Sequence, residues 1–173
     1  KSIDDDTDLW YKVDINDESL QTILSDKVYT VYKNFSDESS FLWAGTPDGL
    51  GYSDDDGSTW SIYRYWNSTS QTDNEIGLSA FPNPFYIDEH NNVDGDGHVR
   101  IIYNNIDSNN STIDVFNFSM NHIVSLHNSI PISSNENEFI WNGRDKYNQQ
   151  VVNGVYFLRL TINANIYWTK LMI

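Results

Sequence analysis

The chain has 173 residues, no cysteine and a formal net charge of −15, from 25 acidic and 10 basic side chains. This acidic balance argues against nucleic acid and anionic membrane surfaces as partners, and no apolar run approaches the ~20 residues that a membrane span requires. Hydrophobic residues make up 39 % of the chain and aromatic residues 14 %, enough for a core in one ordinary domain or two small ones.

The chain begins with Lys rather than Met, and no signal peptide is visible. We therefore expect it to be a processed product or the C-terminal part of a longer chain. The first stretch, Lys1–Asp8, is acidic, and both a calcium cluster and a solvated tail fit its composition. We favour the tail, because no Gly and Glu at the spacing of an EF-hand loop follow it.

β-branched and aromatic residues predict a series of short strands in the first third of the chain. The connection Ser19–Asp26 has room for one helical turn, and Pro47-Asp48-Gly49 is a turn signal. The predicted strands are Leu9–Ile15, Val28–Lys33, Phe41–Thr46, Leu50–Ser53 and Thr59–Trp66.

The stretch Ser53–Trp60 has the pattern S-x-D-x-G-x-T-W. Such a pattern predicts a polar turn, because Ser and Asp side chains hydrogen-bond turn backbone and Gly takes conformations that other residues resist. The stretch resembles the Asp-box of sialidase-like and sortilin-like β-propellers, and Leu42–Leu50 resembles the strand-turn-strand before such a box. The resemblance implies a structural box on the outer rim of a blade, formed here by Ser53, Asp55, Gly57, Thr59 and Trp60.

Under this resemblance, residues 1–66 are a terminal propeller blade preceded by the outer strand of another blade. One blade cannot bury both of its faces, and propellers have 4–8 blades. Either further blades precede this half or it packs against something else. Its aromatic residues are best interpreted as core, but exposed ones would stack on sugar rings or seek a partner. The aromatic residues that cluster in this half are Trp43, Trp60, Tyr63, Tyr65 and Trp66.

The polar stretch Asn67–Gly77 lacks periodicity and is the expected boundary between two domains. Beyond it, about seven short strands separated by turn signals predict an immunoglobulin-like β-sandwich over 78–173. The clearest strand is Val155–Ile162, in which Tyr156, Leu158, Leu160 and Ile162 share one face. We expect the strand to start already at Val151-Val152, with a turn or bulge at Asn153-Gly154. The other predicted strands are Val99–Tyr103, Ile113–Phe118, Ile123–Leu126, Phe139–Trp141 and Ile166–Ile173.

Three motifs in this half occur in order: F-P-N-P-F at Phe81–Phe85, W-N-G-R-D followed by V-V-N-G-V-Y-F within Trp141–Phe157, and Lys170–Ile173. Together they resemble the FlgD-type immunoglobulin-like domain, which is similar to the C-terminal sorting domains of type IX secretion. The resemblance implies structural roles for Pro82, Pro84, Trp141, Gly143, Asp145, Gly154 and Tyr156, and makes Lys170 the candidate sorting residue.

Two glycines of that family pattern are missing. After Ile113–Asn117 the chain has Met120-Asn121 where the pattern has Gly, and in the polar turn Asn148 or Gln149 replaces Gly. Asn tolerates the left-handed conformation that such turns require, so we expect the turns to survive.

Few residues in the chain have a pattern that indicates chemistry. Asp94 and Asp96 resemble part of a calcium loop, but no Glu follows at the twelfth position, so a plain turn is favoured over calcium. The histidines are scattered, which argues against zinc. Arg64, Arg100 and Arg144 lie on different elements and cannot form the arginine cluster of a sialidase-like active site.

The sequence therefore predicts an all-β, non-enzymatic chain without catalytic residues, and glycosidase assays on it should be negative. We expect the C-terminal region of a secreted or surface-bound bacterial protein, with its immunoglobulin-like domain serving secretion targeting or cell-surface anchoring. Its partner would be the secretion machinery or a cell-surface component. The alternatives are a subunit of an extracellular assembly that self-associates, and the tail of a propeller glycoside hydrolase or polysaccharide-binding protein.

Overall fold

The computed structural model describes residues 2–3, 10–11, 23, 25–35, 40–64, 76–104, 111–127, 129–133 and 136–173. The chain divides into two compact units, Lys1–Tyr65 and Trp66–Ile173. Every secondary-structure element in the described ranges is a β-strand, so the prediction of an all-β chain is confirmed. Those ranges contain no helix that could cross a membrane. Most of the predicted linker Asn67–Gly77 lies outside them.

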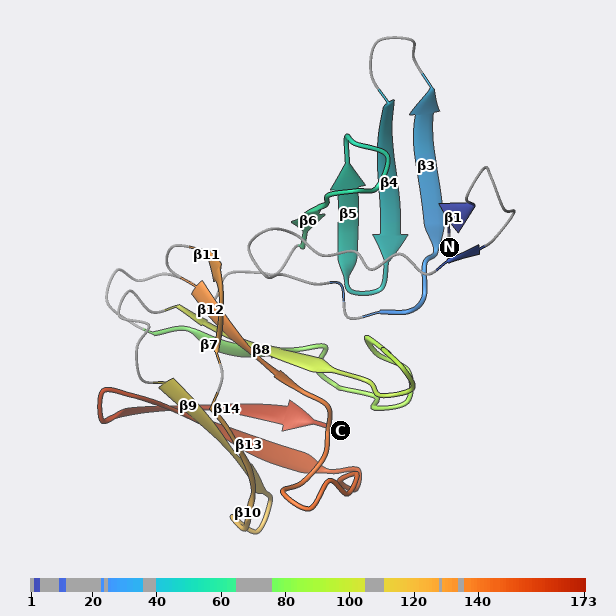
Figure 1. Cartoon of the computed structure of the whole chain (residues 1–173). Coiled ribbons are helices and arrows are strands. Elements are labelled where there is room, and N and C mark those ends of the chain that lie inside the picture. The colour runs from blue at the N-terminus through green and yellow to red at the C-terminus, as the bar shows by residue number, and fades with distance from the viewer. Residues whose placement is uncertain are drawn as a thin grey trace. The chain divides into compact units, whose positions relative to one another are not determined.

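The N-terminal unit contains an antiparallel sheet in which the strand order follows the chain order (Figure 1). Its four strands are β3 (Thr30–Phe35), β4 (Ser40–Thr46), β5 (Gly49–Ser53) and β6 (Ser61–Tyr63). A meander of this kind is the form of one propeller blade. The described part of the unit adds only the short pair β1 (Ser2–Ile3) and β2 (Trp10–Tyr11). Of the predicted strand Leu9–Ile15, only β2 is described.

The C-terminal unit contains two four-stranded sheets in which all pairs are antiparallel. One has the order β7-β8-β12-β11 and the other β14-β13-β9-β10. These orders correspond to A-B-E-D and G-F-C with one added strand, the topology of an immunoglobulin-like sandwich. The strands are β7 (Leu78–Phe81), β8 (Val99–Asn104), β9 (Ser111–Asn117), β10 (His122–Leu126), β11 (Ile130–Ser133), β12 (Glu136–Trp141), β13 (Val155–Ile162) and β14 (Asn165–Met172).

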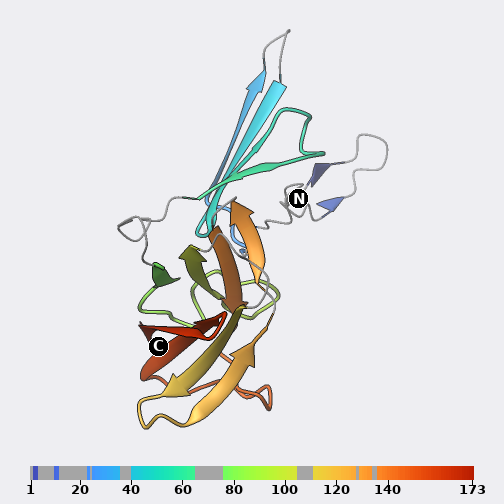
Figure 2. The ribbon, with the colours of Figure 1, turned by 90° about the vertical axis from the view of Figure 1, so that its left-hand side faces the viewer.

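The sandwich core lies between these two sheets and is filled by alternate side chains of their strands. The predicted apolar face of β13 is confirmed, because every second residue from Tyr156 to Ile162 is at most 3 % exposed. In Figure 2 the β9–β10 hairpin (yellow to orange) and the β13–β14 hairpin (red) lie together. The core residues are Phe85, Val99, Ile101, Tyr103, Ile113, Val115, Phe139, Trp141, Tyr156, Leu158, Leu160, Ile162 and Leu171.

The structure corrects some predicted strands. Val151 and Val152 lie outside β13, because the backbone N–H of Val151 instead donates to Gly143 O at 2.9 Å and closes the turn. Strands β7 and β11 were not predicted. Both are short, and β11 contains Pro131, which a strand tolerates only at an edge or a bulge. Strand β6 is shorter than predicted, and the residues after Arg64 lie outside the described ranges.

Candidate functional site

The stretch Ser53–Trp60 forms one closed turn after β5. The Ser53 hydroxyl accepts a hydrogen bond from the Gly57 N–H at 2.8 Å and donates to the Asp55 carboxylate at 2.8 Å. Thr59 donates to the same carboxylate from its N–H at 2.8 Å and from its hydroxyl at 2.7 Å. The Trp60 indole N–H donates to Gly57 O at 3.1 Å, and Gly57 has a φ of 90°. The five predicted residues are therefore joined by hydrogen bonds within one turn.

The charge on Asp55 belongs to this turn. The hydrogen bond from the Thr59 hydroxyl, then those from the Thr59 N–H and the Ser53 hydroxyl, lower the pKa of Asp55 to about 2. The carboxylate is thus ionised at neutral pH and is occupied by three donors from its own turn. A carboxylate in this state cannot act as a general acid near neutral pH.

Aromatic side chains line one face of the N-terminal sheet. The strand register places Tyr32, Trp43 and Tyr52 opposite one another. The ring centroids of Trp43 and Tyr52 lie 4.6 Å apart, and those of Trp43 and Tyr63 lie 6.0 Å apart. Tyr32 and Tyr63 remain 59 % and 54 % exposed. Of the other residues in the predicted aromatic cluster, Trp60 is buried, and Tyr65 and Trp66 lie outside the described ranges.

The connection between β12 and β13 brings together the second motif of the C-terminal half. The Trp141 indole N–H donates to Arg144 O at 2.9 Å, and Asp145 Oδ1 accepts from the N–H groups of Tyr147 and Gln149 at 2.8 and 2.9 Å. The Tyr156 hydroxyl donates to Val152 O at 2.7 Å. A Tyr at the start of strand F that bonds the backbone just upstream is the tyrosine corner of immunoglobulin-like folds.

The same connection explains its glycines. Gly143 has a φ of 71°, and a Cβ placed there would lie 2.6 Å from the Ile87 side chain, so a larger residue would strain the backbone and displace Ile87. Gly154 exchanges two backbone hydrogen bonds with Ile173, at 2.8 and 2.9 Å. Where the family pattern has Gly, Asn148 and Met120 adopt φ values of 63° and 61°. Both turns form with a non-glycine residue in the left-handed region. The expectation that Asn takes this conformation holds at Asn148, but in the turn after β9 the residue with positive φ is Met120 and not Asn121.

The opening segment Phe81–Phe85 is tied to the last strand by a residue that sequence reasoning did not single out. The peptide bonds before Pro82 and Pro84 are cis. Between them, the Asn83 side-chain amide donates to Lys170 O at 2.9 Å and accepts from the Met172 N–H at 3.1 Å. An amide that donates and accepts in this way occupies the hydrogen-bonding position of a neighbouring strand. The only sequence signal for this role is the place of Asn83 between two prolines.

Lys170 lies on what we call the outer face, the side of the β14-β13-β9-β10 sheet turned away from the core. There, Phe157 pairs with Lys170 and Phe116, and Arg159 pairs with Trp168 and Asp114. The Arg159 guanidinium lies 4.9 Å from the centroid of the Phe116 ring and 5.8 Å from that of Trp168. Large apolar side chains remain exposed on or beside this face: Phe118 (74 %), Ile166 (53 %), Trp168 (47 %) and Met172 (41 %).

A polar network crosses the middle of the outer face. Asp114 accepts hydrogen bonds from Arg159 at 2.7 Å and from the Ser125 hydroxyl at 2.5 Å, and His122 Nε2 lies 2.9 Å from that hydroxyl. Burial alone would raise the pKa of Asp114, but the bonds from Ser125 and Arg159 outweigh it and hold the pKa below its usual value. The network thus fixes Arg159 between two aromatic rings.

The two aspartates of the calcium-like loop have separate surroundings. Asp96 forms an ion pair with Arg144 at 2.6 Å, and this hydrogen bond lowers the pKa of Asp96. Asp94 is exposed and has a φ of 53°. Within the described residues, no three His, Asp or Glu side chains gather where they could hold a metal ion. Calcium binding at this loop stays a prediction, and a calcium titration of the chain would test it.

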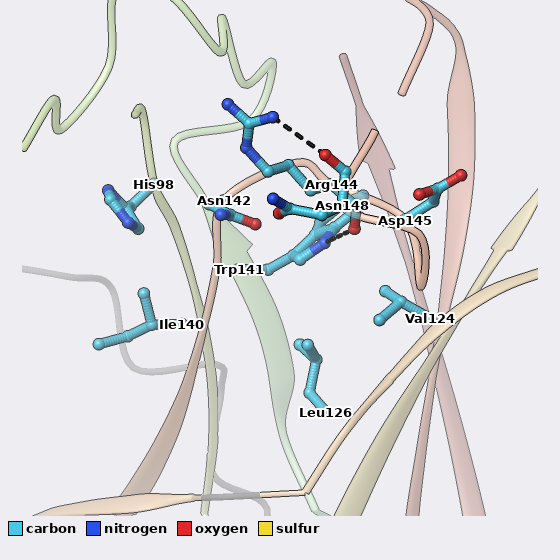
Figure 3. A pocket seen from close by; sticks show the side chains of 9 residues that line it. All are labelled: His98, Val124, Leu126, Ile140, Trp141, Asn142, Arg144, Asp145 and Asn148. Carbon is cyan, nitrogen blue, oxygen red and sulfur yellow. Dashed lines mark hydrogen bonds between the residues drawn. The ribbon is translucent and has the colours of Figure 1, made fainter. Parts of the chain in front are cut away.

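A cavity of about 340 Å³ opens beside the β12–β13 connection (Figure 3). Val124, Leu126 and Ile140 line its apolar part. Its rim is polar, and there Arg144 donates to Asn148 O at 3.2 Å. The size is at the lower end for a small-molecule site. No sequence signal pointed to this cavity, because its lining comes from strands distant in the chain.

No protein-family model matches the chain, and neither does any curated protein. A solved structure with which the chain aligns is PorZ, described as an essential bacterial surface component of the type IX secretion system of Porphyromonas gingivalis. The alignment has 16 % sequence identity and a TM-score of 0.37, and it covers 84 % of this chain and 16 % of that chain. The chain thus spans less than a fifth of the PorZ chain.

Proposed function

We propose that the chain is a non-catalytic region of an exported bacterial surface or secreted protein, and that its C-terminal sandwich serves secretion targeting or cell-surface anchoring. The observation that carries the proposal is the outer face, where Lys170 lies on the last strand beside exposed Trp168 and opposite Phe157. Aromatic, Met and Arg side chains are enriched at the centres of protein interfaces. The outer face has this composition.

The outer face is also held rigid, which favours binding. Strand β13 is paired on both sides, and Asn83 fixes the backbone of β14 on both sides of Leu171. A partner that meets Lys170 and Trp168 therefore does not have to order the strand that carries them. Pre-organisation of this kind lowers the entropic cost of binding.

The use of the acidic side chains supports a non-catalytic role. Asp55 and Asp145 accept hydrogen bonds from turn N–H groups, while Asp96 and Asp114 are paired with arginines. Asp55 and Asp145 therefore stabilise the backbone of turns, and Asp96 and Asp114 hold arginine side chains in place. Turnover of glycosides by the purified chain would contradict the proposal and favour the hydrolase alternative.

An export experiment tests the proposed role. The chain is fused to the C-terminus of a reporter protein in a bacterium that has a type IX secretion system, and reporter is measured on the cell surface and in the medium. We expect export of the wild-type fusion. Lys170→Ala and Trp168→Ala should lower it at least tenfold, because both remove contacts of the outer face without removing a core side chain.

The matched control for this experiment is Lys146→Ala. Lys146 is an exposed lysine of the same unit that lies over the ring of Tyr147. Its backbone N–H donates to Ile123 O of β10, which is the edge strand opposite β14 in the sheet. Its removal should leave export unchanged. Reporter that stays inside the cell with the wild-type fusion, or equal losses with Lys146→Ala and Lys170→Ala, would overturn the targeting role.

The assembly alternative draws on a different region. Tyr32 and Tyr63 remain more than half exposed on the N-terminal sheet, and a sheet face of this kind favours association. We expect this alternative to show as concentration-dependent assembly of the chain, and a monomer at high concentration would count against it.

A further inference from the structure

The first strand of the N-terminal sheet has an apolar edge. Strand β3 pairs with β4 on one side, and in the described part of the chain no strand pairs with its other side. The segment Lys27–Lys33 carries four large apolar side chains that are exposed on both of its faces: Val28 (47 %), Tyr29 (64 %), Val31 (61 %) and Tyr32 (59 %). A long, exposed, apolar edge strand is a template for pairing with another chain.

The outermost strands of the C-terminal sandwich differ from β3 in this respect. Strand β11 contains Pro131 and a register shift, and β7 has only four residues. The end of β14 is occupied by the Asn83 amide, and in β10 the Ile123 carbonyl accepts from the Lys146 N–H. Such features protect an edge against added strands. In β3, by contrast, the exposed side chains are mainly tyrosine and valine.

The sequence of this edge is complementary to itself. Residues 27–33 read K-V-Y-T-V-Y-K, which is nearly symmetric about Thr30. When two copies pair antiparallel with Thr30 opposite Thr30, Val28 lies opposite Tyr32 of the second copy and Tyr29 lies opposite Val31. Every apolar pair then joins an aromatic and a β-branched side chain, the kind of cross-strand pair that stabilises sheets by roughly 0.2–1 kcal/mol.

We propose that the segment Lys27–Lys33, which consists of the three residues before β3 and the first four residues of β3, is a homodimerisation edge. At this edge, two copies of the chain join their N-terminal sheets into one eight-stranded sheet through antiparallel pairing centred on Thr30. The pairing is isologous, so each copy uses its single β3 edge and the assembly closes as a dimer. The inference is independent of the proposed role of the C-terminal sandwich.

The charges at the edge set how the dimer responds to salt. In this register Lys27 lies opposite Lys33 of the second copy, and each chain has a net charge of −15. Part of the lysine repulsion is offset, because Lys33 Nζ lies 2.7 Å from Asp56 Oδ1 and Lys27 Nζ lies 4.9 Å from the centre of the Tyr29 ring. Salt screens both repulsions. We therefore expect the dimer to tighten as the salt concentration rises.

The test is sedimentation equilibrium of the full chain from roughly 1 µM to 1 mM protein. Wild type should dimerise in this range. Tyr29→Lys alone and Val31→Glu alone each place a charge opposite an apolar side chain, and each should weaken the dimer at least tenfold. Neither residue is buried, so both variants should keep their fold, which circular dichroism checks.

Two further samples test the register itself. The double variant Tyr29→Lys/Val31→Glu, and an equimolar mixture of the two single variants, place lysine opposite glutamate across the interface. Both should recover dimerisation. Tyr86→Lys is the matched control, because Tyr86 is a similarly exposed aromatic residue, 54 % exposed, in the C-terminal unit.

Three results would overturn the proposal. One is a monomeric wild type across the whole range. Another is a dimer that Tyr29→Lys and Val31→Glu leave intact, or that Tyr86→Lys abolishes, because the interface would then lie elsewhere. The third is a failure of both the double variant and the mixture to recover dimerisation, which would exclude pairing centred on Thr30.

Discussion

In the C-terminal sandwich, Leu158 and Leu160 are fully buried between two sheets, whereas in the N-terminal sheet Tyr32 and Tyr63 stay more than half exposed. The two regions have similar strands, but among the described residues the sandwich has two facing four-stranded sheets and the N-terminal unit has one four-stranded sheet. Two facing sheets share one core, so apolar residues on one face of each strand are enough. A single sheet has no facing layer of its own. In the described part of the N-terminal unit, the buried apolar residues are correspondingly few: Ile23, Ala44 and Trp60.

The two regions are stabilised by different interactions. The sandwich depends on packing, with polar turns at its ends. The N-terminal sheet has a polar turn in which one carboxylate accepts three hydrogen bonds, and it leaves large apolar side chains exposed.

The largest effect is expected at a buried ion pair of the sandwich. Arg100 Nη1 lies 2.6 Å from Glu138 Oε1, and their side chains are 0 % and 1 % exposed. Arg100→Ala leaves a buried charge without this partner and should lower the free energy of unfolding by about 3–5 kcal/mol. Urea denaturation measures it. The double variant Arg100→Leu/Glu138→Leu should be much less affected, and an equal loss in both variants would mean that packing rather than charge is responsible.

The next effect concerns the turn of the N-terminal sheet. Asp55→Ala removes the acceptor for both hydrogen bonds from Thr59, so the N-terminal sheet should lose protection against amide hydrogen exchange while the sandwich keeps its own. Asp54→Ala is the matched control, since Asp54 is an exposed neighbour in the same turn. Equal protection in both variants would show that packing alone holds this sheet.

Acid should act on the same turn. The pKa of Asp55 is lowered from 3.8 to about 2, so its contribution to stability is fully present above pH 3.8 and is lost as the pH falls toward 2. We expect the hydrogen-exchange protection of the N-terminal sheet to decline across this window in wild type. In Asp55→Asn the decline should be shallower, and identical pH profiles would remove Asp55 from the explanation.

The tyrosine corner has a smaller effect. Tyr156→Phe removes the hydrogen bond to Val152 O and leaves the ring packed against Trp141, so the sandwich should lose about 0.5–1.5 kcal/mol in urea denaturation. Tyr147→Phe is the control, because Tyr147 is 72 % exposed. A loss as large as that of a core truncation would mean that the hydroxyl does more than hold the corner.

The sequence predicted those parts of the fold that repeat with strand periodicity or depend on turn chemistry. The buried face of β13 follows from alternation, and the turn at Asp55 follows from its Ser, Asp and Gly spacing. Strands β7 and β11 were missed because a short edge strand has too few residues to show alternation. The Asn83 contact with β14 joins residues 87 and 89 positions apart, and local patterns carry no information on such pairs.

The outer face shows the same limit for the candidate site. Lys170 was singled out by resemblance, but its neighbours were not. Phe116, Phe157 and Trp168 meet only because three strands pair in one register. Alternation along each strand predicts that these side chains point outward, but it does not predict which residue lies opposite on the neighbouring strand. The pairing register of the strands therefore brings these outward side chains together on one surface.

The smallest effect should come from the replaced glycines of the sandwich. Met120 has a φ of 61°, which costs a residue with a large side chain about 1–2 kcal/mol, while Gly in its place costs about 0.5–1 kcal/mol in unfolded-state entropy. Met120→Gly should thus stabilise the sandwich by up to about 1 kcal/mol in urea denaturation. Asn148→Gly should gain less, because Asn tolerates the left-handed region better than Met does. A larger gain for Asn148→Gly would reverse the order that backbone strain predicts, and would leave the loss of the exposed Met120 side chain as the decisive change.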